Sequence, residues 1–119
     1  MDYKFIKMEY LDSVSEGDPE IIREIFVIFK DQAVEIYNEM ILHLSNKNYP
    51  LLGFLAHKAK SSVAIMGMDD LAQMLKTFEL EAKQGKDPDL YESYITRFKV
   101  ETDEAVKELE NYINRLSAR

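Results

Sequence analysis

The chain has 119 residues, 46% hydrophobic and 31% charged, which is the length and composition of one globular domain over residues 1–119. Its 22 acidic residues outnumber its 15 basic ones, and the net charge of −7 argues against nucleic-acid binding, because phosphate contacts need clustered lysines and arginines. The lack of cysteine excludes disulfides, a thiol nucleophile and cysteine-ligated metals. The sequence contains no run of 18 apolar residues, so no membrane-spanning helix is predicted.

Four amphipathic helices are predicted, each by apolar residues that recur every three or four positions. A short helix within about 5–15 is expected to precede them and to cover one end of the fold. The long helices are expected at residues 19–44, 50–66, 69–84 and 88–117. Asp18-Pro19 has the N-cap and first-turn proline typical of a helix start, Asp87-Pro88 repeats that signal, and Gly85 is expected to end the third long helix.

The apolar stripes of these helices are the expected core. Their residues are Ile22, Phe26, Phe29, Ala33, Ile36, Met40 and Leu44; Leu52, Ala56, Ala59, Val63 and Met66; Leu71, Leu75, Phe78 and Ala82; and Tyr91, Ile95, Phe98, Thr102, Ala105, Leu109, Tyr112 and Leu116. Because the connections are short, we expect an all-α fold: an antiparallel up-down four-helix bundle with a short N-terminal helix.

One histidine of the second long helix is a candidate functional residue. His57 follows the inward-facing Ala56, so its side chain lies about 100° around the helix, at the edge of the core face or outside it. Its neighbours on that face are Gly53, Lys60, Ser61 and Ala64. Three of the four are small, so we expect the imidazole to be accessible to another protein, and this access would explain a glycine within a helix.

The charge pattern points to the same place. Residues 40–68 contain no Asp or Glu but include Lys47, Lys58 and Lys60, so this window carries +3 and the rest of the chain −10. A positive region around an exposed His57 suits a histidine that becomes phosphorylated, because the lysines offset the negative charge of the phosphoryl group. The alternative is that this histidine is an ordinary surface residue.

The segment 56–62, Ala-His-Lys-Ala-Lys-Ser-Ser, followed by Gly67, resembles the signature of histidine-containing phosphotransfer (HPt) domains, roughly A-H-x-L-K-G-S-x-x-x-x-G. The Gly-Asp-Pro-Glu at 17–20 resembles the common start of that family's long helix. The Leu-Lys-Thr-Phe-Glu at 75–79 is similar to the L-x-x-L-E of its fourth helix. The similarity covers about residues 11–116.

This resemblance implies a four-helix bundle that carries a phosphoryl group and has no kinase activity. His57 would accept the group on Nε2 from a receiver-domain phospho-aspartate and pass it to the aspartate of another receiver. Lys60 would stabilise the phosphoryl group, and Glu79 would bond Nδ1 of the histidine and thereby fix its tautomer. The implied partners are response-regulator receiver domains, with a hybrid histidine kinase as a further candidate.

No cofactor or metal is expected on this chain, and the Mg²⁺ that phosphoryl transfer needs is expected on the receiver. A di-iron bundle site would need Glu three residues before each histidine, but Met40 and Phe54 precede His43 and His57. The zinc motif H-E-x-x-H and a Gly-rich nucleotide loop are also missing from the sequence.

Two residues depart from the family pattern. Ser61 stands where the family most often has Gly, and Ala59 stands where Leu or Ile is common. Apolar residues near the site, Phe54 and Met68, are expected to be exposed and to form a docking patch with Gly53, Ser61 and Ala64. The main alternative function is a helical docking module that binds signalling partners without being phosphorylated.

The expected location is the cytoplasm, because the first residues lack the apolar region of a signal peptide. The opening Met1 favours a whole short protein over an excised domain. A monomer is expected, as is usual for a bundle of this kind.

Overall fold

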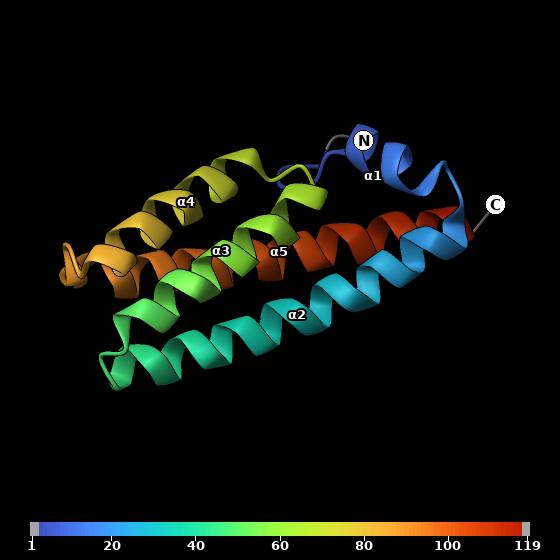
Figure 1. The fold of residues 1–119 in the computed structure, drawn as a ribbon. Coiled ribbons are helices and arrows are strands. Elements are labelled where there is room, and N and C mark those ends of the chain that lie inside the picture. The colour runs from blue at the N-terminus through green and yellow to red at the C-terminus, as the bar shows by residue number, and fades with distance from the viewer. Residues whose placement is uncertain (1–2, 118–119) are drawn as a thin grey trace.

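The computed structural model describes residues 3–117, and over this range the chain is all-helical, which confirms that the fold is all-α. The helices are α1 (Met8–Ser15), α2 (Pro19–Ser45), α3 (Tyr49–Ile65), α4 (Asp69–Gln84) and α5 (Tyr91–Ser117), with a 3-10 turn η1 (Pro88–Leu90) before α5. Each long helix turns back on the one before it through a short connection (Figure 1). None of the described helices is long and apolar enough to cross a membrane.

Side-chain caps begin α2 and α3, whereas α1, α4 and η1 begin without one. The Asp18 carboxylate accepts a hydrogen bond of 2.9 Å from the backbone N–H of Glu20, as an N-cap residue should. Gly85 ends α4 in the left-handed conformation at φ +63°. The predicted N-cap at Asp87 is wrong: this residue has φ +53° and makes no side-chain cap bond, and η1 replaces the expected first turn of the last helix.

The core lies where the apolar stripes place it. The predicted core residues are buried, except for four that are half-buried: Phe26, Leu44, Tyr112 and Leu116. Helix α3 packs against α4 and α2, and α5 packs against α2 and α4. The side of α3 that faces inward includes two fully buried alanines, Ala56 and Ala59, whose small side chains let neighbouring helices approach closely.

The N-terminal segment is fastened to α5 by one carboxylate. The carboxylate of Glu108 in α5 accepts hydrogen bonds from the backbone N–H groups of Lys4, Phe5 and Ile6, at 3.1, 2.9 and 3.1 Å. These bonds satisfy three backbone donors that precede the first helix. As a result α1, with Leu11 buried, lies beside the C-terminal end of α3 (Figure 1).

Candidate functional site

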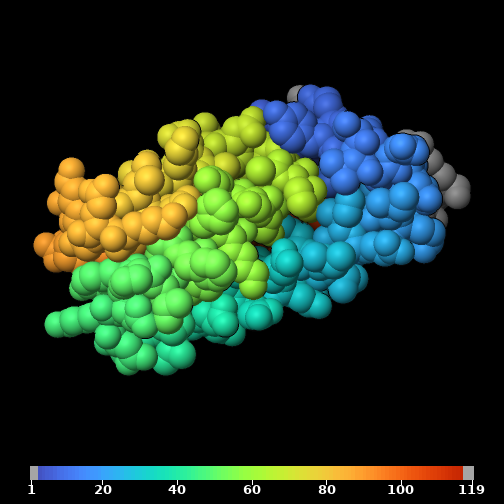
Figure 2. All heavy atoms as spheres, viewed as in Figure 1, coloured from blue at the N-terminus to red at the C-terminus, as the bar shows by residue number. Residues whose placement is uncertain are grey.

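The candidate histidine lies on α3, the helix whose surface Figure 2 shows between those of α4 and α2. The side chain of His57 is 55% exposed, whereas Ala56 and Ala59, which belong to the inward-facing stripe of the same helix, are buried. The predicted place of this imidazole, at the outer edge of the core face, is therefore confirmed.

A buried carboxylate from the next helix contacts this histidine. Glu79 of α4 is only 8% exposed at its side chain, and its Oε2 lies 3.1 Å from Nδ1 of His57. Two ammonium groups share the same carboxylate: Lys60 Nζ lies 3.3 Å from Oε1 and Lys83 Nζ lies 2.7 Å from Oε2. Three partners therefore satisfy a charge that would be costly to bury alone.

These contacts keep the carboxylate ionised. The pKa of Glu79 falls from its usual 4.5 to about 2. The hydrogen bond from Lys83 is the largest cause, and the bonds from His57 and Lys60 act in the same direction, whereas burial alone would raise the pKa. Near neutral pH this group can thus only accept hydrogen bonds.

The ionised carboxylate determines the tautomer of the imidazole. Because Glu79 has no proton to donate, Nδ1 of His57 must be the donor in their 3.1 Å contact. In a neutral imidazole the lone pair is then on Nε2, the ring nitrogen that has no protein hydrogen bond among the described contacts. The buried carboxylate therefore orients the ring and leaves Nε2 available as a nucleophile.

Sequence reasoning missed Lys83. It lies four residues after Glu79 on the same helix, and a Glu followed by Lys at this spacing is a pair that stabilises helices. That local signal was available, but it does not distinguish a surface ion pair from one at a site. Only the packing of α4 against α3 brings the Lys83–Glu79 pair to His57.

Two residues expected on the exposed docking patch are buried instead. Gly53 packs against α4, where a Cβ would lie 2.9 Å from Cγ of Lys83 and 3.2 Å from the backbone oxygen of Glu79. Access to the histidine is therefore the wrong explanation for this glycine, and the close approach of α4 is the right one. Met68, at the start of α4, is also a core residue.

The other three patch residues, Phe54, Ser61 and Ala64, are exposed on α3 as expected. The Ser61 hydroxyl lies 3.5 Å from the backbone oxygen of His57, one turn earlier in the helix. This back-bonded position leaves the hydroxyl near the histidine without covering it.

Comparison with known proteins identifies one family. The family model described as the Hpt domain matches residues 24–119, which is most of the chain. Neither the comparison with curated proteins nor the comparison with solved structures finds a match.

Within residues 3–117 there is no group of three or more His, Cys, Asp or Glu side chains that could hold a metal ion.

The packing of Gly53 predicts the effect of filling its space. We expect Gly53→Leu to lower the free energy of unfolding by about 1–3 kcal/mol, because the side chain would collide with the backbone of α4. The matched control is Ala64→Leu, an exposed position on the same helix, with an expected change within about 0.5 kcal/mol. Urea unfolding measures both, and equal stability of the two variants would contradict the close packing.

The lowered pKa of Glu79 predicts a pH dependence of stability. Between about pH 4.5 and 2 the unfolded chain binds a proton at this residue that the folded chain does not, so the free energy of unfolding falls as the pH falls through this window. We expect Glu79→Gln to make the slope shallower, whereas Glu104→Gln, at an exposed residue of α5, should leave it unchanged. Unfolding curves at several pH values test this, and identical slopes for all three proteins would refute it.

Proposed function

The chain belongs to the Hpt domain family, a family of phosphorelay histidine phosphotransfer modules, and from this premise we propose that it is a phosphocarrier whose phosphorylated residue is His57. It accepts the phosphoryl group from a receiver-domain aspartate and passes it to a second receiver. The observation that carries this assignment is the contact between Nδ1 of His57 and the buried Glu79, which leaves the lone pair on Nε2 of an exposed ring.

The chemistry is the exchange of one bond to phosphorus. The Nε2 lone pair attacks the phosphorus of an aspartyl phosphate, an N–P bond forms, the bond from phosphorus to the aspartate oxygen breaks, and the carboxylate leaves. The ring gains positive charge as Nε2 attacks, and Nδ1–H of His57 stays bonded to the ionised Glu79, which stabilises that charge. The reverse exchange on a second receiver returns the histidine to its neutral form.

Two lysines complete the electrostatics of the site. Lys60 and Lys83 together outweigh the one negative charge of Glu79, so the site has a surplus of positive charge before any phosphoryl group arrives. Lys60 lies on the same helix as His57, one turn further on, and its ammonium can turn from the carboxylate to the phosphoryl oxygens. Lys83 stays with Glu79 and acts through it as a positioning residue.

A receiver would approach over the exposed part of α3. Phe54, Ser61 and Ala64 surround the histidine with one aromatic and two small side chains, and such a surface permits close contact by another backbone. We place the Mg²⁺ of the transfer reaction on the receiver. The antiparallel up-down bundle expected from the sequence supplies a rigid support for this face.

The first test is the loss of the nucleophile. We expect His57→Gln to keep its helical circular dichroism and to accept no phosphoryl group from a panel of phosphorylated receiver domains. Intact mass, measured at neutral pH and again after mild acid, should show an acid-labile adduct on the wild type alone. An undiminished adduct on the variant would overturn the site, and no adduct on either protein would favour the docking module without phosphorylation.

The second test separates the lysines. We expect Lys60→Ala and Lys83→Ala each to slow phosphoryl transfer by about ten- to hundredfold, because each removes a charge-assisted hydrogen bond from the site. Lys83→Ala should also raise the pKa of Glu79, which shifts the acid limb of the transfer rate to higher pH.

Lys58→Ala is the matched control, because this exposed lysine neighbours the histidine in sequence and belongs to the same positive window. Its transfer rate should stay within about twofold of the wild type. Equal rates for all four proteins in a rapid-quench measurement would show that the two lysines have no electrostatic role.

A further inference from the structure

The proton on the imidazole of His57 has two possible fates once the ring is phosphorylated. In the free protein this proton is on Nδ1, and the carboxylate of Glu79 accepts its hydrogen bond at 3.1 Å. After Nε2 has bonded to phosphorus, the ring is either a cation that keeps the Nδ1 proton or a neutral group that has lost it. The two forms differ in reactivity, so the surroundings of Nδ1 determine how long the phosphoryl group stays.

Glu79 is the base nearest to this proton, but its other partners make it a poor acceptor. Its carboxylate oxygens hold Lys83 Nζ at 2.7 Å and Lys60 Nζ at 3.3 Å. The hydrogen bond from Lys83, with those from His57 and Lys60, holds the pKa of Glu79 at about 2, although burial acts in the opposite direction. Within residues 3–117 these three groups, two from α3 and one from α4, are the ion-pair partners of Glu79.

Loss of the proton would also leave two acceptors facing one another. Nδ1 of His57 would then present a lone pair to the ionised Oε2 of Glu79 at 3.1 Å, with no proton between them. The side chain of Glu79 is only 8% exposed, so it has little room to turn into water. Because a buried anion that loses a donor is costly, the site stabilises the ring as the cation.

We propose that phosphorylated His57 keeps its Nδ1 proton near neutral pH, so that the carrier holds a short-lived phosphorylated imidazolium. This inference rests on the proposed phosphocarrier function and concerns the same site between its two exchanges. Glu79 is the residue that keeps the proton in place, and Lys83 acts through Glu79 by keeping it ionised.

The retained proton decides which group leaves phosphorus in the second exchange. An aspartate oxygen of the receiver forms a bond to phosphorus, the bond from phosphorus to Nε2 of His57 breaks, and its electron pair returns to Nε2. With Nδ1 protonated, the leaving group is a neutral imidazole. Without that proton it is an imidazolate anion, which is a much poorer leaving group. Both exchanges therefore proceed with no proton entering or leaving the ring.

The exposure of the ring has a second consequence. The side chain of His57 is 55% exposed, and Nε2 has no protein hydrogen bond among the described contacts. Water therefore reaches the phosphorus–nitrogen bond whenever no receiver covers it, and the neutral leaving group favours hydrolysis as it favours transfer. The site suits a relay that passes its phosphoryl group on promptly and does not store it.

The direct test observes the proton on the phosphorylated ring. The full chain, labelled with nitrogen-15 in histidine, is loaded with phosphoramidate, a small phosphoryl donor that needs no receiver. Long-range proton–nitrogen NMR spectra are recorded at about pH 7.5, where an ordinary imidazole is mostly unprotonated. We expect Nδ1 of phosphorylated His57 to show the chemical shift of a protonated nitrogen. His57→Gln, in which His43 is the one remaining histidine, identifies the signals.

Glu79→Gln separates this role from a structural one. A carboxamide can donate its N–H to an unprotonated Nδ1, so we expect the variant to stabilise the neutral phosphorylated ring. Its phosphohistidine should have a half-life at least about fivefold longer, and its transfer to a receiver should be at least about tenfold slower. Glu104→Gln, at an exposed residue of α5, is the matched control and should behave as the wild type does. Circular dichroism verifies that each variant is folded, and the wild-type spectrum needs no variant.

The outcomes distinguish this inference from the phosphocarrier assignment. An adduct on His57 with a protonated Nδ1 supports the inference. An adduct on His57 with an unprotonated Nδ1, including one to which Lys83 has turned to donate, overturns the inference and leaves the phosphocarrier assignment intact. A half-life and a transfer rate that Glu79→Gln leaves unchanged do the same. A wild type that accepts a phosphoryl group from neither phosphoramidate nor a panel of phosphorylated receivers overturns both.

Discussion

The buried carboxylate of Glu79 is the constraint on which the candidate site depends. A carboxylate at the α3–α4 interface is tolerated only if donors surround it, and Lys60, Lys83 and His57 are those donors. The same three contacts keep the group ionised, and the ionised group in turn sets the proton on Nδ1 of the histidine. Stability and site geometry therefore rest on the same four side chains.

The approach of α4 to α3 is what lets one carboxylate reach all three donors. Gly53 has no side chain where the backbone of Glu79 passes, and Ala56 and Ala59 bury only methyl groups on the inward side of α3. Larger residues at these positions would push the helices apart. Ala59, which departs from the resembled family pattern, is fully buried and fits this close packing.

Positive charge gathers around the histidine in an otherwise acidic chain. This region lies on α3 and α4, where Lys60 and Lys83 exceed the charge of the Glu79 carboxylate between them.

The sequence by itself determined the helices, their starts and the candidate histidine. Periodic apolar residues and caps such as Asp18 act within one or two helical turns, so they can be recognised from the sequence alone. The spacing of His57 and Lys60 also lies within one helix. Asp87 is the local exception, since its backbone conformation prevents the capping that its residue type favours.

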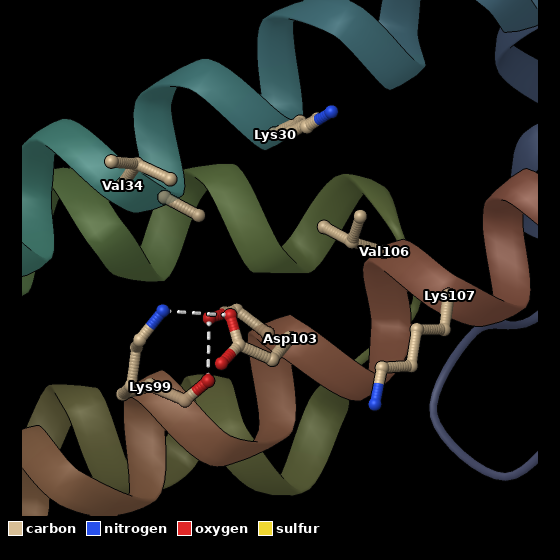
Figure 3. Close-up of a pocket in the computed structure, with 8 residues that line it drawn as sticks. Lys30, Val34, Lys99, Asp103, Val106 and Lys107 are labelled. Atoms are coloured by element: carbon tan, nitrogen blue, oxygen red, sulfur yellow. Dashed lines mark hydrogen bonds and ion pairs between the residues drawn. The ribbon is translucent and has the colours of Figure 1, made fainter.

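Only the tertiary structure decided what lies across from each helix. Gly53 and Met68 were expected to be exposed, and Lys83 was not singled out, because a helical period indicates which side of a helix is apolar but not how near the next helix comes. A groove between α2 and α5, lined by residues of both helices, has the same origin (Figure 3). Lys30 and Lys107 are far apart in the chain, and only the packing of two helices makes them opposite rims of one surface.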